Sequence, residues 1–127
     1  MDKPSVFISY TDIDKKGKEF GIKLKQIFQN LRYDIFLFDH QKSEYLGKEI
    51  WDVLVKEIMN REVIIVICTD AITGSTGVNF EINQALSRDK LIIPLKYNDI
   101  KVPKTLFHLI YMTFNEDDFS FFAFLLR

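Results

Sequence analysis

The stretch EVIIVICT, from Glu62 to Thr69, is nearly continuous isoleucine and valine. A strand with one face in water alternates apolar and polar residues, whereas a strand of a parallel sheet is covered on both faces and shows no alternation. This stretch therefore predicts a strand that is buried on both faces of a parallel sheet. Short apolar runs and segments of helical periodicity alternate along the rest of the chain.

Four further short apolar runs predict strands, two before the Glu62–Thr69 run and two after it. They are SVFISY (Ser5–Tyr10), YDIFLFD (Tyr33–Asp39), LIIPLKY (Leu91–Tyr97) and LIYMTF (Leu109–Phe114). Because Pro94 has no backbone N–H to donate, it either weakens the centre of the fourth strand or places that strand at an edge of the sheet.

Segments of helical periodicity separate these strands. One runs from about Lys15 to Leu31, a second from Ile50 to about Asn60, and a third follows the TGSTG loop. A closing helix is predicted in DDFSFFAFLLR, residues 117–127. The apolar positions of the first three helices are Phe20, Leu24, Ile27, Phe28 and Leu31; Ile50, Val53, Leu54 and Ile58; and Val78, Ile82, Ala85 and Leu86.

This alternation predicts one domain over residues 1–127, an α/β flavodoxin-like three-layer sandwich. Its five-stranded parallel sheet has the order 2-1-3-4-5. In such sheets ligands bind beyond the carboxyl ends of the strands, near the switch between the first and third strands. The residues predicted at that edge are Tyr10, Thr11 and Asp12 after the first strand, Asp39 after the second, and Cys68, Thr69 and Asp70 after the third.

Composition narrows the class of protein. The chain has 17 basic and 18 acidic residues, a formal charge of −1, which argues against a nucleic-acid stripe or a membrane-surface patch. One cysteine excludes an internal disulfide and suits a reducing compartment. The start MDKPSVFISY lacks the apolar stretch of a secretory signal, and no apolar run is long enough to span a bilayer. A soluble, cytoplasmic domain is expected.

The loop TGSTG, Thr73 to Gly77, leads into a helix that carries Glu81. Three interpretations are open for this loop: a phosphate cradle, an ordinary helix cap, or the rim of an active site. No Gly-x-x-x-x-Gly-Lys-Ser/Thr or Gly-x-Gly-x-x-Gly pattern supports a phosphate loop. Glu81 cannot complete a capping box, because Val78 stands where Ser or Thr is needed. At 100° per residue Glu81 lies on the flank of the apolar stripe, which predicts a half-buried carboxylate.

Proteins of this fold can also carry a phosphoacceptor aspartate, a metal site or a reactive thiol, and each requires particular residues. A phosphoacceptor receiver would end its third strand in aspartate, where this chain has Cys68 and Thr69. The two histidines, His40 and His108, stand alone, so no metal site is predicted. Cys68 is either a thiol nucleophile, which would need a nearby base, or a small apolar residue that closes a buried strand.

Four pieces, in this order and at these spacings, resemble the Toll/interleukin-receptor (TIR) domain family from Ser5 to about Phe114. SVFISY resembles the first conserved box of the family, and YDIFLFD with the polar loop up to Gly47 resembles its second strand and functional loop. VIIVICT resembles the third strand, which usually ends in Ser where this chain has Cys68. NFEINQAL resembles the helix that carries the family's glutamate, here Glu81.

The resemblance implies one of two functions. Some TIR domains are scaffolds that join other TIR domains, and others cleave the nicotinamide–ribose bond of NAD with the glutamate of this helix. Glu81 favours the enzymatic class, although the family often has Trp four residues earlier, where this chain has Gly77. A carboxylate there would stabilise the positive charge that develops on the ribosyl group.

The resemblance also implies roles for the residues of the ligand edge. Tyr10 and Thr11 would line the ribose–nicotinamide site, although Tyr10 could equally be a core residue. Asp39 and the loop HQKSEYLG would form a mobile lid, in which Tyr45 stacks on a base or is simply a half-exposed loop aromatic. Tyr45 and Leu46 would also contact a second copy of the domain.

The leading hypothesis is therefore a TIR-domain NAD glycohydrolase, or a cyclase that forms a cyclic ADP-ribose, in microbial antiviral defence or signalling. NAD is expected as substrate, with no separate cofactor, and other TIR domains as partners in a weak homo-oligomer. The alternative is a non-catalytic TIR–TIR interaction module. A third interpretation is an unrelated nucleotide-binding domain of the same fold.

Overall fold

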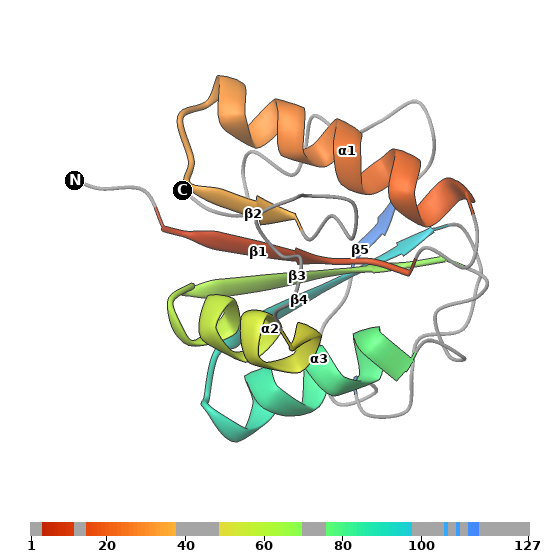
Figure 1. Cartoon of the computed structure of the whole chain (residues 1–127). Helices are drawn as coiled ribbons and strands as arrows, with labels where there is room; N and C mark the ends of the chain where they lie inside the picture. Colours follow the sequence, from red (N-terminus) through yellow and green to blue (C-terminus); the bar gives the residue numbers. More distant parts are fainter. Residues whose placement is uncertain are drawn as a thin grey trace.

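A computed structural model gives the fold and describes residues 4–11, 15–37, 49–69, 76–97, 106, 109 and 112–114. Strands and helices alternate along these residues as far as the fourth strand (Figure 1). The elements are β1 (Val6–Ser9), α1 (Lys15–Asn30), β2 (Ile35–Leu37), α2 (Ile50–Met59), β3 (Val63–Cys68), α3 (Thr76–Ser87), β4 (Leu91–Tyr97) and β5 (Met112–Phe114).

The described strands form one sheet in the order β2-β1-β3-β4-β5, and each neighbouring pair is parallel. This confirms the flavodoxin-like order predicted from the sequence. In the register of the sheet, Ile8 of β1 lies between Leu37 of β2 and Ile65 of β3. All six residues of β3 are buried, as its run of isoleucine and valine predicts.

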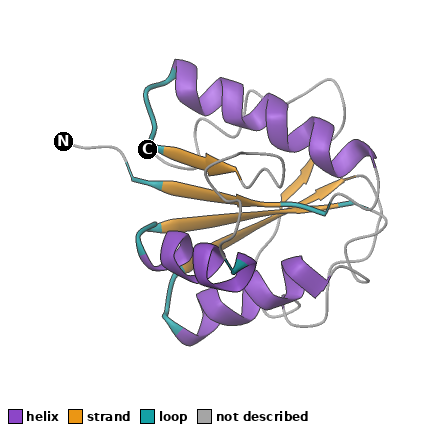
Figure 2. Cartoon of the chain, in the orientation of Figure 1, coloured by secondary structure: helices purple, strands orange, loops and turns teal. Residues whose placement is uncertain are grey.

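Helices cover both faces of the sheet, α1 on one side and α2 with α3 on the other (Figures 1 and 2). The side chains of β3 divide between these layers by strict alternation. Ile65 and Ile67 belong to the cluster under α1, whereas Ile64, Val66 and Cys68 belong to the cluster under α2 and α3. The central strand thus joins two hydrophobic cores.

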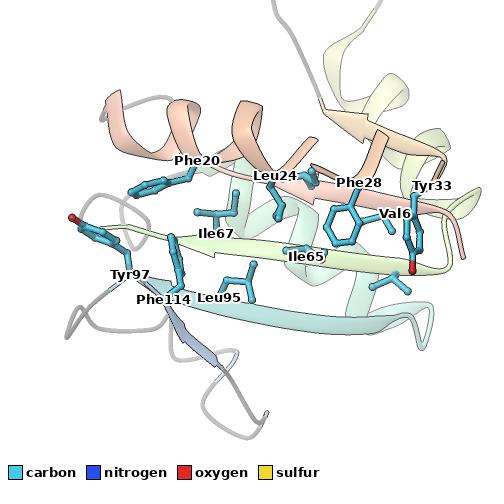
Figure 3. Packing of buried hydrophobic residues seen from close by; sticks show 12 residues of the cluster. Val6, Phe20, Leu24, Phe28, Tyr33, Ile65, Ile67, Leu95, Tyr97 and Phe114 are labelled. Atoms are coloured by element: carbon cyan, nitrogen blue, oxygen red, sulfur yellow. The ribbon is translucent and has the colours of Figure 1, made fainter. Parts of the chain in front are cut away.

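Phe20, Leu24 and Phe28 of α1 recur every four residues and point together onto the sheet (Figure 3). Each of the three is at most 2% exposed. The ring of Phe20 meets Tyr97 at 4.9 Å and Phe114 at 5.1 Å between ring centroids, which ties α1 to β4 and β5. Burial of each large apolar side chain contributes roughly 1.5–3 kcal/mol to folding.

Pro94 does not place its strand at an edge, because β4 lies between β3 and β5. Pro94 stands opposite Val66 of β3 and is buried. The described ladder between β4 and β5 begins one residue later, at Leu95. The proline therefore occupies an interior strand at a position just before that ladder starts, which corrects the edge interpretation.

Two helices end on a non-glycine residue with a left-handed backbone. Arg32 after α1 has φ 66°, and Asp89 after α3 has φ 53°. In each case the next residue closes the helix end, with Tyr33 N–H donating to Phe28 O and Lys90 N–H donating to Ala85 O. This bonding pattern usually has glycine at the left-handed position.

Candidate functional site

The switch point of the sheet lies between β1 and β3, the two strands whose connecting helices α1 and α2 leave to opposite faces (Figure 1). Side chains at the carboxyl ends of these strands are therefore not both covered by one helix. Buried polar side chains gather here: Ser9, Thr11 and Thr69 are each 1% exposed. A buried polar group needs a hydrogen-bonding partner, so these residues mark a polar region at the end of an otherwise apolar sheet.

Glu81 lies in the second turn of α3 and belongs to this polar region. Its neighbours Val78, Ile82 and Ala85 form the buried stripe of the helix, each at most 1% exposed. Glu81 itself is only 6% exposed, so it is more deeply buried than the half-buried position predicted from the helical period. The period gives the angle around the helix, whereas the depth depends on how closely α3 packs on the sheet.

Ser9, the last residue of β1, is the hydrogen-bonding partner of Glu81. Its hydroxyl donates to Oε1 of the carboxylate at 2.8 Å, across 72 residues of sequence. The contact joins the carboxyl end of β1 to α3, on the face of the sheet covered by α2 and α3.

Burial raises the pKa of Glu81 from 4.5 to about 8, and the hydrogen bond from Ser9 partly opposes this rise. Removal from water penalises the charged carboxylate, while a donor to the carboxylate favours it. At neutral pH the carboxyl is thus mostly protonated, and it reaches the balance between its neutral and charged forms near pH 8. A carboxyl with a pKa shifted in this way, at the ligand edge of a sheet, is characteristic of functional sites.

Thr11 and Cys68 lie at the predicted edge with different surroundings. Thr11 is buried two residues after the end of β1. Cys68 has no exposed surface, and burial raises the pKa of its thiol to about 12. Its thiol lies 3.7 Å from Val66 O within the cluster under α2 and α3. The thiol is therefore neutral at physiological pH, and its surroundings match the small apolar residue that closes a strand.

Tyr10 packs against the α1 cluster, on the opposite side of the sheet from the Ser9–Glu81 contact. Its ring lies close to Gly21 of α1, where an added Cβ would come within 3.6 Å of the ring and 3.2 Å of Leu37. These contacts are those of a core residue, which is the alternative to a place in the ribose–nicotinamide site. Asp12, Asp39, Tyr45, Leu46 and Asp70 lie outside the described residues, as does the start of the TGSTG loop.

The family can now be assigned. The sequence pattern of the TIR domain matches residues 6–126 of the chain. The chain belongs to the TIR domain family. No curated protein sequence matches it at a significant level.

Several solved structures share the fold of this TIR domain. The TIR domain of the Toll-related receptor TRR-2 from Hydra magnipapillata superposes with a TM-score of 0.74 at 20% identity, covering 87% of this chain and 84% of that one. TIR domains of the activated Roq1 resistosome give 0.63 at 21% identity, covering 75% and 58%. The 2-deoxyribosyltransferase of Bacillus psychrosaccharolyticus gives 0.67 at 11% identity, covering 87% and 85%. At these identities the likeness concerns the fold.

Two features of this TIR domain are not predicted from the sequence. The first is the contact of Ser9 with Glu81, although a serine at the end of an otherwise apolar strand, at the edge where ligands bind, indicates a polar role. The second feature is an aromatic pair: Trp51 of α2, 40% exposed, meets Phe80 of α3 at 4.6 Å between ring centroids. Phe80 precedes Glu81, but the sequence offered no reason to pair it with Trp51.

The described residues contain neither a candidate membrane span nor a candidate metal site. Among these residues, none of the helices combines the length and the apolar character that a membrane span requires. In the same ranges, no three His, Cys, Asp or Glu side chains come together in a group able to hold a metal ion.

Proposed function

We propose that this TIR domain cleaves the nicotinamide–ribose bond of NAD, with Glu81 as the residue that acts on the ribosyl group. The observation that carries the proposal is the buried carboxyl of Glu81 at the ligand edge, hydrogen-bonded by Ser9. Sequence position alone suggested this residue, and its burial gives an independent physical reason to assign it a function.

A buried carboxyl of this kind does not help the fold. An ionised carboxylate removed from water is unfavourable unless a cation pairs with it, and the partner provided by the described residues is the neutral hydroxyl of Ser9. No capping box explains its position, because Val78 lies three residues before it. A residue that reduces stability without a structural role is typical of a functional site.

The chemistry requires a negative charge more than a proton donor. When the bond from C1′ of the ribose to the ring nitrogen breaks, its electron pair leaves with nicotinamide, which becomes neutral. The ribosyl group is left with oxocarbenium character, and a carboxylate close to it would stabilise the positive charge. Capture by water gives ADP-ribose and releases one proton; capture by a nitrogen of the adenine ring gives a cyclic product.

The raised pKa of Glu81 must be compatible with this role. In the free protein the carboxyl is largely protonated at neutral pH, because its pKa is about 8. NAD brings a positively charged nicotinamide ring, and a positive charge within about 4–6 Å favours the ionised carboxylate. Bound substrate would thus generate the charge that the reaction uses.

The fold is known to support related chemistry. One structural neighbour is a 2-deoxyribosyltransferase described as a biocatalyst for the synthesis of nucleosides, so a similar arrangement of strands and helices occurs in an enzyme that transfers a deoxyribosyl group. That neighbour supports the proposal only through its fold, since its identity to this chain is 11%.

The test is to incubate purified protein with NAD and to separate the products by chromatography. Wild type should release nicotinamide together with ADP-ribose or a cyclic isomer. Glu81→Gln should lower the rate at least a hundredfold, as expected when a group that stabilises transition-state charge is lost. The matched control is Glu19→Gln, which removes an exposed carboxylate of α1 and should leave the rate unchanged.

The proposal includes weak self-association through the loop that carries Tyr45 and Leu46, in a defence or signalling setting. The near-zero net charge of the chain offers little repulsion between copies. Specific activity should rise with protein concentration over about three decades, and Tyr45→Glu or Leu46→Glu should weaken that rise. Activity that does not change with concentration, and is unaltered in both variants, would show a self-sufficient monomer.

A non-catalytic interaction module is the second candidate, because the burial that raises the pKa of Glu81 also limits the access of a substrate to its carboxyl. A carboxyl that is 6% exposed offers little surface to a substrate. If the domain only joins other TIR domains, concentration-dependent association will be observed by light scattering while NAD stays intact.

A further inference from the structure

Ser9 is the one polar residue in β1. Val6, Phe7 and Ile8 are each at most 1% exposed, and so is Ser9. A buried hydroxyl without a partner would be unfavourable, and Ser9 finds its acceptor in Oε1 of Glu81 at 2.8 Å. A hydrogen bond to a carboxylate is shorter and stronger than one between neutral groups.

We propose that Ser9 is a positioning residue for this site: its hydroxyl holds Oε1 of Glu81, so that Oε2 is the oxygen presented to the ribose of NAD. The proposal rests on the proposed function, NAD cleavage. It assigns different tasks to the two oxygens of one carboxylate, one fixed by the protein and one used on the substrate.

The strand that carries Ser9 is a rigid support. Ser9 pairs with Val66 in the ladder between β1 and β3, and the preceding Ile8 pairs on its other side with Leu37 of β2. Glu81, by contrast, has three rotatable side-chain bonds that could turn its carboxyl in several directions. A donor on a paired strand restricts these directions, and such preorganisation is what a catalytic group requires.

The same contact adjusts the ionisation of Glu81. The hydroxyl donates to the charged form and so lowers the pKa, against the rise that burial causes. Without Ser9 the pKa of Glu81 would therefore lie still higher, and less carboxylate would be available at neutral pH. Ser9 thus both orients the carboxyl of Glu81 and favours its ionised form.

Within the described residues, other charged groups do not account for this pKa. Among the described elements, α3 packs mainly against α2, β3 and β4, and the Ser9 hydroxyl joins it to β1, which has no ionisable side chain. Their titratable side chains are Asp52, Lys56 and Glu57 on α2, Cys68 on β3, and Lys96 and Tyr97 on β4. None of them is among the causes of the Glu81 shift, which are burial and Ser9.

The first experiment compares the pH dependence of NAD cleavage in three variants. Ser9→Ala should lower kcat by about 10- to 100-fold, as misplacement of a reacting group does, and should move the acid limb of kcat/KM to higher pH. Ser9→Thr keeps the hydroxyl and should restore most of the rate. Ser5→Ala is the matched control, because Ser5 directly precedes the other end of β1 and its hydroxyl donates to Asn60 O and accepts from Glu62 N–H.

A double variant separates positioning from independent catalysis. If Ser9 acts through Glu81, adding Ser9→Ala to Glu81→Gln should lower the residual rate by less than twofold. A further tenfold loss in the double variant would show that Ser9 acts on the substrate by itself, which would overturn the proposal.

The second experiment needs no activity. NMR of protein labelled with 13C at the glutamate carboxyl follows the titration of Glu81, whose signal is the one missing in Glu81→Gln. The pKa of Glu81 should be higher in Ser9→Ala than in wild type, and unchanged in Ser5→Ala. If wild type leaves NAD intact, the proposed function fails, and this titration still decides whether Ser9 holds the carboxyl. Equal titration curves for Glu81 in wild type and in folded Ser9→Ala would overturn the proposal, whereas Ser9→Thr, which keeps the hydroxyl, should titrate like wild type.

Discussion

Replacement of Glu81 by Gln should stabilise this TIR domain relative to wild type by an amount that grows as the pH rises above 5, because it removes a carboxyl whose ionisation is unfavourable in the folded state. The sign follows from the pKa. The carboxyl has a pKa of about 8 when folded, against 4.5 as the ordinary value. Between these values the unfolded chain has released the proton and the folded chain still holds it, so the free energy of unfolding falls as pH rises.

The magnitude follows from the same two values. They differ by about 3.5 units, and each unit corresponds to about 1.4 kcal/mol, so the full loss of stability on passing from pH 4 to pH 9 is about 5 kcal/mol. About 3 kcal/mol of it has already been lost at pH 7. Glutamine keeps an oxygen that can accept from the hydroxyl of Ser9. Its buried NH₂ group, however, lowers the free energy of unfolding by about 1–3 kcal/mol if no acceptor is available to it. The expected net gain in Glu81→Gln is therefore about 0–2 kcal/mol at pH 7 and larger at pH 8.5, where almost the full 5 kcal/mol has been lost in wild type.

Urea unfolding followed by circular dichroism measures this difference at pH 5, 7 and 8.5. Other groups titrate over the same range, so the informative quantity is the difference between Glu81→Gln and wild type, with Glu19→Gln as the control for an exposed carboxylate. That difference should grow with pH in Glu81→Gln and stay flat in the control. If the free energy of unfolding of Glu81→Gln minus that of wild type changes by less than about 1 kcal/mol from pH 5 to pH 8.5, the pKa of Glu81 is not raised and the reasoning built on it is refuted.

Four other outcomes are expected. For NAD cleavage, kcat/KM should rise with pH up to about 8, the pKa of Glu81 in the free protein, while the acid limb of kcat lies at lower pH because bound substrate favours the carboxylate. Ile65→Ala should lower the free energy of unfolding by about 2–5 kcal/mol in urea titrations, since this side chain is fully buried. Arg32→Gly and Asp89→Gly should each raise the free energy of unfolding by roughly 0.5–1 kcal/mol, observed as a higher melting temperature, because glycine adopts a positive φ without strain. Cys68 should react with an aromatic disulfide reagent only after denaturant is added, since its thiol is buried and neutral.

The layers of the fold could be predicted because they depend on short-range patterns. The run of isoleucine and valine at Val63–Cys68 predicts a strand covered on both faces, and β3 is buried at each of its residues. Helical spacing predicts the segment from Lys15 to Leu31, and α1 ends one residue earlier, at Asn30. Once strands and helices alternate, connection rules leave few possible orders for a five-stranded sheet.

The site depends on contacts between distant parts of the chain, and these were only partly predictable. The angular position of Glu81 follows from the helix, but its depth depends on the packing of α3 on the sheet. The bond from Ser9 links residues 72 positions apart, and no periodicity relates them. Pro94 shows the same limit, because a local rule against proline in interior strands ignores where the neighbouring ladder begins.

The burial of Glu81 and its ionisation have opposite effects on catalysis, so the two have to be considered together. A solvated carboxylate would be charged but weakly effective, since water screens its interaction with a developing cation. A buried carboxylate interacts strongly but resists ionisation, which is the state of Glu81 in the free protein. A cationic substrate resolves this conflict on the proposed mechanism, because its own charge favours the ionised form at the place where the charge is used. The protein then carries the unfavourable charge only while substrate is bound, and Ser9 reduces the free energy needed to reach that state.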